Sequence, residues 1–266
     1  MNDMSLVWTA VLVLSIIGAI CVIVLIIASK YMSVPVDETA VKIRECLAGA
    51  NCGACGYAGC DGYAAALAAG EITETTLCVP GGAEAAKGIA AVLGVEAGEV
   101  VAKKAYVKCN GTCDKANKKY EYEGIQTCYA AKILFNGEWA CTSGCLGYGD
   151  CEKACPSGAI AVENGVAKVN PFKCTGCGIC ANQCPQKVIA IRTENDHTIV
   201  RCNSKVPAKL KRAACTAGCI SCKACERACP NGAIAVTDNL AQIDYSKCTS
   251  CGACKDACKF GVIESL

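Results

Sequence analysis

Cysteine is the residue type whose number and spacing point to chemistry in this chain. The 266 residues include 27 cysteines but a single histidine, His197. The cysteines gather in closely spaced runs, and proline follows the last cysteine of three runs, at Pro156, Pro185 and Pro230. Bacterial ferredoxins hold [4Fe–4S] clusters with runs of this kind. Iron–sulfur clusters are therefore the prediction, and four-thiolate zinc sites are the alternative.

The composition argues against other classes of protein. A secreted disulfide scaffold has an even number of cysteines and follows a secretory signal, whereas the number here is odd and the C-x-x-C spacing is regular. The chain has no phosphate-cradling glycine motif and no nucleophile next to a base. We therefore expect neither an NAD site nor a flavin site on this chain, and we expect His197 to be a surface residue.

The runs belong to an internal duplication. Residues 128–184 and 202–258 share one pattern, 74 positions apart and without a gap. The one mismatch among the cysteines is Tyr148, because the second copy has Cys222 at that position. Such a repeat indicates two copies of one structural unit. The matching cysteines are Cys128 and Cys202, Cys141 and Cys215, Cys145 and Cys219, Cys151 and Cys225, Cys155 and Cys229, Cys174 and Cys248, Cys177 and Cys251, Cys180 and Cys254, and Cys184 and Cys258.

Each copy is predicted to be a bacterial-type 2[4Fe–4S] ferredoxin. Strands at 159–162 and 233–236 lead into turns at 164–165 and 238–239, which indicates a β-hairpin between the runs. In such ferredoxins the fourth cysteine of each run ligates the other cluster. The complete sites are therefore Cys219, Cys222 and Cys225 with Cys258; Cys248, Cys251 and Cys254 with Cys229; and Cys174, Cys177 and Cys180 with Cys155.

One site of the first copy departs from this rule. Cys145, Cys151 and Cys184 occupy the expected positions, but Tyr148 replaces the remaining thiolate. Either Cys141 supplies the fourth ligand, or the site holds a three-iron cluster. We favour Cys141, since the loop around the tyrosine is rich in glycine and flexible enough to bring it in. The duplication weighs against this choice, because Cys141 has a counterpart in a copy that lacks no ligand.

Further cysteines have no place in the ferredoxin pattern. Four of them are enough for a sixth cluster that bridges the two copies, although buried free thiols are the simpler interpretation. Five clusters are thus expected, and a sixth stays open. The residues concerned are Cys109, Cys113, Cys128, Cys202 and Cys215.

A separate group of four cysteines precedes the repeats, with the spacing C-x2-C-x4-C-x17-C. Glycines beside these cysteines let the backbone approach closely and direct amide groups at an anionic cluster. Alanine-rich helices are expected at 63–69 and 84–93. A zinc knuckle is the alternative for this group. Its members are Cys52, Cys55, Cys60 and Cys78.

An uncharged stretch, residues 6–28, lies near the N-terminus. As a helix it would extend roughly 34 Å, enough to span the hydrocarbon core of a bilayer. The one charged side chain before it is Asp3, whereas Lys30, Lys42 and Arg44 follow it. The positive-inside tendency then predicts a retained single-pass anchor in the cell (cytoplasmic) membrane, with the C-terminal domains in the cytoplasm.

The predicted chain is thus of the α+β class and has five parts. They are a transmembrane anchor (1–30), a four-cysteine [4Fe–4S] domain (31–93), a connecting segment with extra cysteines (94–127), and ferredoxin repeats at 128–200 and 201–266.

The stretch NCGACGYAGCDGYA at 51–64, with CVPGG at 78–82, resembles the iron–sulfur domain of the Rnf complex B subunit. The order of anchor, four-cysteine domain and two ferredoxin repeats is also similar to that family, and the resemblance covers essentially the whole chain. It implies a subunit of a membrane complex that passes electrons from reduced ferredoxin to NAD, coupled to Na⁺ or H⁺ transport. It also implies that Cys52, Cys55, Cys60 and Cys78 ligate the first cluster.

Two basic segments indicate a partner. Residues 103–119 include six basic residues and one acid, and residues 201–212 include five basic residues and no acid. We expect soluble ferredoxin, an acidic electron carrier, to dock there, other membrane subunits to bind the chain, and no nucleic acid to bind it. The alternative function is a membrane-tethered iron–sulfur sensor of oxygen or iron, or a scaffold, which would show no turnover with ferredoxin.

Overall fold

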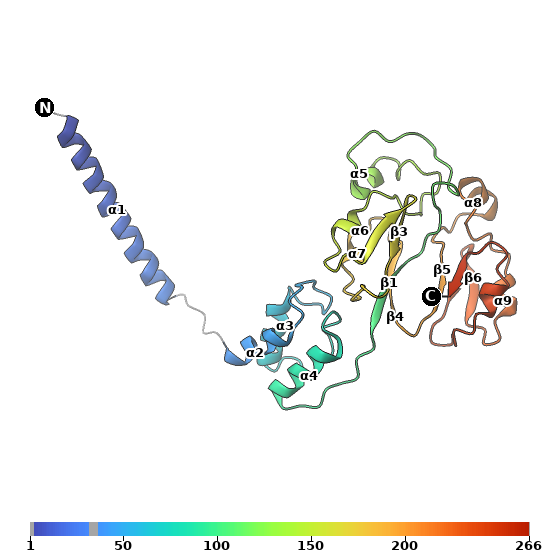
Figure 1. Cartoon of the computed structure of the whole chain (residues 1–266), viewed down its shortest axis with the longest axis horizontal. Helices are drawn as coiled ribbons and strands as arrows, with labels where there is room; N and C mark the ends of the chain where they lie inside the picture. The colour runs from blue at the N-terminus through green and yellow to red at the C-terminus, as the bar shows by residue number, and fades with distance from the viewer. Residues whose placement is uncertain (1–2, 32–36, 266) are drawn as a thin grey trace.

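The computed structural model describes residues 3–31 and 37–265, and within the first helix it describes the side chains of residues 8, 9 and 11–27. That helix, α1, covers Asp3–Tyr31 (Figure 1). Its described apolar side chains are exposed, Trp8 by 69% and Leu14 by 68%. By length and hydropathy together, no helix among the described residues is able to cross a membrane. Part of the span predicted at 6–28 lies outside the described side chains.

Three helices form the four-cysteine domain: α2 (Glu38–Cys46), α3 (Cys60–Ala68) and α4 (Gly82–Leu93). The side chain of Asp37 caps α2, and Gly94, with a φ of 69°, ends α4 in the left-handed conformation. Ile43, Tyr63 and Ile89 are fully buried where the helices meet. Both predicted helices are confirmed, and each begins slightly earlier than expected.

Each ferredoxin repeat contains two separate two-stranded antiparallel sheets (Figure 1). One sheet is the hairpin between the cysteine runs, and the other joins the first strand of the repeat to its last. The strands are β1 (Lys103–Val107) with β4 (Ile189–Thr193) and β2 (Ile160–Glu163) with β3 (Val166–Val169) in the first repeat, and β5 (Thr198–Val200) with β8 (Ile263–Ser265) and β6 (Ile234–Thr237) with β7 (Leu240–Ile243) in the second.

The hairpin turns have the conformation that their residues favour. Asn164 and Gly165 have φ values of 50° and 77°, and Asp238 and Asn239 have φ values of 50° and 59°. Two consecutive residues with positive φ form the type I′ turn, which selects Asn, Asp and Gly. The two hairpins predicted from the sequence are confirmed.

The helix that begins at Cys128 buries that cysteine, and four short helices inside the cysteine runs bury one cysteine each. The chain turns sharply before each of these four, at Gly149, Gly178, Lys223 and Gly252, which all have positive φ. The turn directs the next cysteine toward the interior of the repeat. The helices are α5 (Cys128–Ile133), α6 (Asp150–Lys153, burying Cys151), α7 (Ile179–Gln183, burying Cys180), α8 (Ala208–Ala214), α9 (Ala224–Ala228, burying Cys225) and α10 (Ala253–Asp256, burying Cys254).

Strand pairing divides the repeats at a different place from the sequence prediction. β1 lies in the segment 94–127, yet it pairs with β4 and so belongs to the first repeat. β5 lies at the end of 128–200, yet it pairs with β8 of the second repeat. The sheets therefore separate between residues 193 and 198. β1 ends two residues before Cys109 and β5 ends two residues before Cys202, but neither strand contains a cysteine.

Cysteines make up much of the core of each repeat. In the first repeat Cys151 and Cys180 pack with Ile160, and in the second Cys225 packs with Ile234. The chain has only three Phe and two Trp, so large aromatic side chains contribute little to these cores. The packing of each repeat therefore depends on whatever its cysteines bind.

Candidate iron–sulfur sites

The second repeat brings its predicted ligands together as two sets of four. Each set lines its own cavity, and apolar side chains such as Ile263 and Ile243 complete the walls. In each set three cysteines come from one run and the fourth from the other run, as in a two-cluster ferredoxin. The sets are Cys219, Cys222, Cys225 and Cys258, and Cys229, Cys248, Cys251 and Cys254.

The surroundings of these cysteines control their protonation. Burial, followed by repulsion from Cys219, raises the pKa of Cys225 to about 11. Burial also acts to raise the pKa of Cys229, but hydrogen bonds from backbone N–H groups lower this pKa overall. One of these donors is the N–H of Ala233, whose nitrogen lies 3.3 Å from the sulfur. Since a cluster binds thiolates, its insertion must displace protons from sites such as Cys225.

The regular site of the first repeat has the same construction. Burial, then repulsion from Cys174, Cys177 and Cys155, raises the pKa of Cys180 to about 11, so the four sulfurs are neighbours. The backbone N–H of Ala105 donates to the sulfur of Cys174 at 3.4 Å. Hydrogen bonds of this kind stabilise cluster-bound thiolates and tune the cluster potential.

At the site that lacks a cysteine at position 148, Cys128 is the fourth thiol beside the cavity. Cys128 lines one cavity together with Cys145, Cys151 and Cys184. Burial, followed by repulsion from Cys145, Cys128 and Cys184, raises the pKa of Cys151 to about 12. Cys141, which we favoured from the sequence, does not line this cavity. The lining of the cavity favours Cys128 over Cys141, and the fourth ligand stays a prediction.

Local structure explains why Cys128, and not Cys141, lines this cavity. Cys128 is the first residue of α5, which Thr127 caps by accepting a hydrogen bond from Ala130 N–H at 3.2 Å. The cap directs Cys128 into a small core with Trp139. Tyr148 packs against the ring of Tyr122 instead, at 5.6 Å between ring centroids.

Three of the four predicted ligands of the four-cysteine domain pack with its helical core. Cys55, Cys60 and Cys78 belong to that core. After burial, repulsion from Cys177 and Cys55 raises the pKa of Cys52. Because Cys177 is a residue of the first repeat, cysteines of the domain and of the repeat lie within electrostatic reach of each other.

The remaining extra cysteines separate into two kinds. Cys109, Cys202 and Cys215 are buried at the junction of the repeats, where Cys141 also lies. Cys113 is exposed. The ferredoxin spacing does not group the junction cysteines, which stand at positions 109, 141, 202 and 215, so the tertiary fold is what brings these four together.

None of these groups is arranged around a single ion. Within residues 3–31 and 37–265, no three or more His, Cys, Asp or Glu side chains are gathered so as to hold one metal ion. A four-cysteine zinc site places each sulfur about 2.3 Å from one ion, whereas a [4Fe–4S] cluster separates its thiolates by its own width. Sets of four cysteines that line a cavity therefore fit the cluster.

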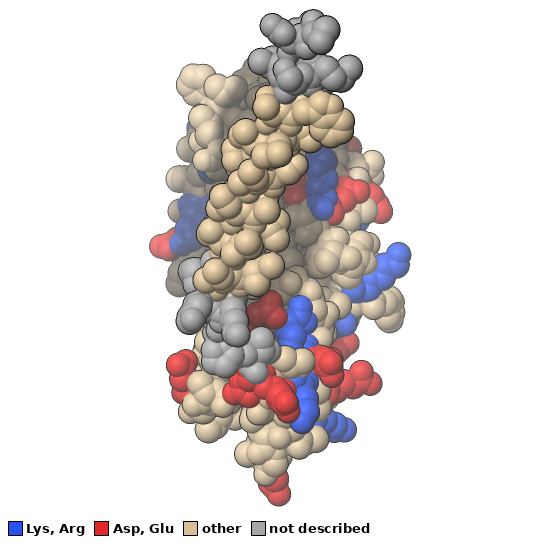
Figure 2. Space-filling model, turned by 90° about the vertical axis from the view of Figure 1, so that its left-hand side faces the viewer, with Lys and Arg blue, Asp and Glu red and all other residues tan. Residues whose placement is uncertain are grey.

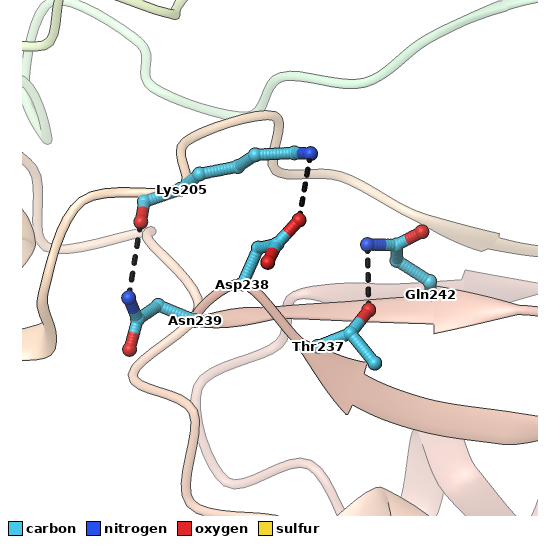
Figure 3. A network of polar contacts seen from close by, with 5 residues as sticks. All are labelled: Lys205, Thr237, Asp238, Asn239 and Gln242. Carbon is cyan, nitrogen blue, oxygen red and sulfur yellow. Dashed lines mark hydrogen bonds and ion pairs between the residues drawn. The ribbon is translucent and has the colours of Figure 1, made fainter.

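Several charges of the basic segments already have partners. Lys205 reaches Asp238 at 3.0 Å above the turn between β6 and β7 (Figure 3), and Lys118 reaches Glu138 at 3.0 Å. Lys211 is buried. The surface offered to an acidic partner is thus smaller than the sequence predicts.

Comparison with known proteins decides the family. The chain is 41% identical over 236 residues to the B subunit of the Na⁺-translocating ferredoxin:NAD⁺ oxidoreductase complex of Acetobacterium woodii, over 88% of this chain and 71% of the relative. It is 40% identical over 244 residues to the B subunit of the proton-translocating ferredoxin:NAD⁺ oxidoreductase complex of Clostridium ljungdahlii, over 91% of this chain and 86% of the relative. The chain belongs to the Rnf B-subunit family. A further Rnf relative, the B subunit of the ion-translocating oxidoreductase complex of Methanosarcina acetivorans, is 40% identical over 91% of this chain and 92% of its own length.

Family models also match the cysteine-rich parts of this Rnf B-subunit family member. The FeS model, for an Fe–S cluster, matches residues 47–80, and models for a 4Fe-4S dicluster domain match residues 138–185, 173–234 and 218–262. The chain therefore carries several [4Fe–4S] clusters and is an electron-transfer subunit of an oxidoreductase complex. The match at 173–234 runs from one repeat into the next, as expected where duplicated runs are alike.

Proposed function

We propose that this chain accepts electrons from reduced soluble ferredoxin and passes them on within a membrane complex that reduces NAD, coupled to Na⁺ or H⁺ translocation. The names of the relatives from A. woodii and C. ljungdahlii support this role, since both are subunits of ion-translocating ferredoxin:NAD⁺ oxidoreductases. Hydride transfer to NAD requires a site that binds the nicotinamide or a flavin. A partner subunit therefore carries out this step.

Five sets of cysteines are proposed as cluster ligands. When bound, a [4Fe–4S] cluster carries one electron at a time, at a potential that depends on hydrogen bonds to sulfur and on solvent exposure. The chain supplies the thiolates, the N–H donors and the burial. The sets are Cys52, Cys55, Cys60 and Cys78; Cys155, Cys174, Cys177 and Cys180; Cys128, Cys145, Cys151 and Cys184; Cys219, Cys222, Cys225 and Cys258; and Cys229, Cys248, Cys251 and Cys254.

The main support for the proposal is that successive sets of cysteines lie next to one another. Cys151 and Cys180 belong to different sets of the first repeat, yet they are close enough for their thiolates to repel each other. Cys177 acts in the same way on Cys52 of the four-cysteine domain. Neighbouring thiolates thus lead through the first ferredoxin repeat to the domain that follows α1, which is the arrangement that electron transfer toward a membrane requires.

We also propose that residues 6–28 form a single-pass membrane anchor with the C-terminal domains in the cytoplasm. The stretch carries no charged residue. The described side chains of α1 are exposed, and Figure 2, which has this helix nearest the viewer, shows its described surface free of acidic and basic residues. An apolar surface of this extent calls for an apolar surrounding.

Electron transfer from ferredoxin tests the proposal. A reduced bacterial two-cluster ferredoxin should reduce the anaerobically purified chain in a stopped-flow experiment. The rate should fall by about tenfold or more between 0.1 M and 1 M salt, because the Debye length shrinks from about 10 Å to about 3 Å. Absence of reduction would contradict the role and favour a sensor. A rate that does not change with salt would contradict docking through the basic surface.

A further inference from the structure

Four cysteines outside the ferredoxin sites meet at the junction between the two repeats. A Cβ added to Gly144 would lie 3.4 Å from the sulfur of Cys141 and 3.6 Å from that of Cys109. A Cβ added to Gly111 would lie 3.2 Å from the sulfur of Cys215 and 3.7 Å from that of Cys109. Cys109 is therefore shared by both contacts, and the two glycines leave the space that these three sulfurs face.

Cys202 is the fourth member of this junction group. It is 8% exposed, as are Cys109 and Cys215. After burial, repulsion from Cys109, Cys141 and Cys202 raises the pKa of Cys215 to about 11. Sulfurs from both repeats thus lie near one another, three of them buried, and the group has the number of thiolates that a [4Fe–4S] cluster needs.

Backbone hydrogen bonds hold the two repeats together at this point. The N–H of Asn117 donates to the carbonyl of Ala214 at 3.0 Å, and the N–H of Thr216 donates to the carbonyl of Lys115 at 2.9 Å. These bonds run on both sides of Cys215 and join its segment to the segment that carries Cys109. The junction group is therefore built into the interface and does not depend on exposed loops.

A buried cation stands beside the junction group. Lys211, on α8, is 1% exposed, and its ammonium donates to the carbonyl of Asn239 at 2.6 Å. Among the described residues no carboxylate forms an ion pair with it. Burial of an ammonium without an anion is strongly unfavourable. The N–H of Cys215 donates to the carbonyl of Lys211 at 2.8 Å, so a thiolate of the junction group would be an anion close to this ammonium.

We propose that Cys109, Cys141, Cys202 and Cys215 bind a sixth [4Fe–4S] cluster between the two repeats, and that Lys211 is its counter-cation. The site extends the proposed function, on which it rests, because it joins the cysteine sets of the two repeats. On one side the N–H of Cys145 donates to the sulfur of Cys109 at 3.4 Å.

On the other side, Cys219 of the second repeat lies next to Cys202 and donates a backbone hydrogen bond to it. The junction site therefore gives the sets of the second repeat a thiolate neighbour in the first. With it, the cysteine sets form one series from the C-terminal repeat to the four-cysteine domain.

Iron content tests the metal site. Full-length chain with Cys215→Ala should contain about four iron atoms fewer than the wild type, about 20 against about 24. The matched control is Cys113→Ala, an exposed thiol of the same type, which should keep the wild-type content. A Cys215→Ala chain with wild-type iron would overturn the site.

The charge of Lys211 gives an independent measurement that does not need a cysteine variant. Lys211→Met keeps the length of the side chain and removes its charge. In a redox titration followed by EPR, one cluster should become at least tenfold harder to reduce, a fall of about 59 mV for a one-electron couple. Iron content and the other midpoints should not change. The control is Lys209→Met, because Lys209 is an exposed residue of the same helix.

An unchanged set of midpoint potentials in Lys211→Met would overturn its role as counter-cation. Both measurements are made without ferredoxin and without NAD. If these measurements contradict the sixth site but ferredoxin still reduces the chain, only the sixth site is wrong. If they support the sixth site but ferredoxin does not reduce the chain, only the proposed function is wrong.

Discussion

A Cys128→Ala chain is expected to lose the four-iron cluster of the site that contains Tyr148. The iron content should fall from about 24 to about 20 per chain, or to about 23 if a three-iron cluster remains with its own EPR signal. The reason is that Cys128 lines the same cavity as Cys145, Cys151 and Cys184, and no other thiol lines it. Iron and sulfide analysis with EPR measures the change.

A second substitution makes this prediction specific. Tyr148→Cys places a thiol at the position that Cys222 occupies in the second repeat, where Cys222 lines the equivalent cavity. Tyr148→Cys should therefore restore the lost iron to a Cys128→Ala chain. It should not restore iron to a Cys141→Ala chain, because Cys141 lies in the junction group.

The opposite pattern of iron contents would show that Cys141, and not Cys128, is the fourth ligand. If Cys128→Ala keeps all of its iron, or if Tyr148→Cys rescues Cys141→Ala instead, the assignment of Cys128 is wrong. The cost of Tyr148→Cys to packing should be modest, since the tyrosine ring contacts mainly Tyr122 at the edge of a small core.

Removal of iron is expected to unfold both ferredoxin repeats. Their sheets have only two strands each, and isolated two-stranded sheets are marginal at best in water. Their cores contain the cysteines themselves, so apoprotein would retain buried thiols that repel one another once ionised. For small domains of this kind, metal binding supplies much of the folding free energy.

Hydrogen exchange measures this effect segment by segment. Amides of β2, β3, β6 and β7 should lose their protection when iron is removed by chelation under reducing conditions. The helices α2, α3 and α4 provide the internal control, because Ile43, Tyr63 and Ile89 pack together through their own apolar side chains and should keep part of their protection. Protected hairpins in iron-free chain would show that packing alone holds the repeats.

Local sequence patterns were sufficient where the structure is local. The turns at Asn164–Gly165 and Asp238–Asn239 require positive φ, which Asn, Asp and Gly tolerate, so both hairpins could be predicted. The two cysteine sets of the second repeat could also be predicted, because the ferredoxin spacing determines which run supplies the fourth ligand.

The duplication could not show that equivalent cysteines have different uses. Cys128 and Cys202 occupy matching positions in the sequence, but in the second repeat Cys222 lines the cavity, and the proposal places Cys202 in the junction group. In the first repeat Tyr148 stands at the position equivalent to Cys222, and Cys128 lines the cavity. Sequence spacing is identical in both copies, and only the position of the second repeat on the first distinguishes them.

For a similar reason, counting basic residues in the sequence placed one buried lysine on the expected docking surface. Lys211 belongs to the basic segment that was expected to face ferredoxin, but α8 packs with this side chain inward, against Gly218 and the turn at Asn239. Its neighbour Lys209 stays exposed. A helix of seven residues with three basic side chains does not reveal which of them is buried.

Iron, sulfide and zinc analysis of the anaerobically purified full chain, combined with Mössbauer spectroscopy, tests the central claim most directly. The account predicts about 24 iron and about 24 sulfide per chain, all of the iron in four-iron clusters, and no stoichiometric zinc. A colourless chain with zinc in place of iron, or iron well below about 20 per fully loaded chain, would contradict it.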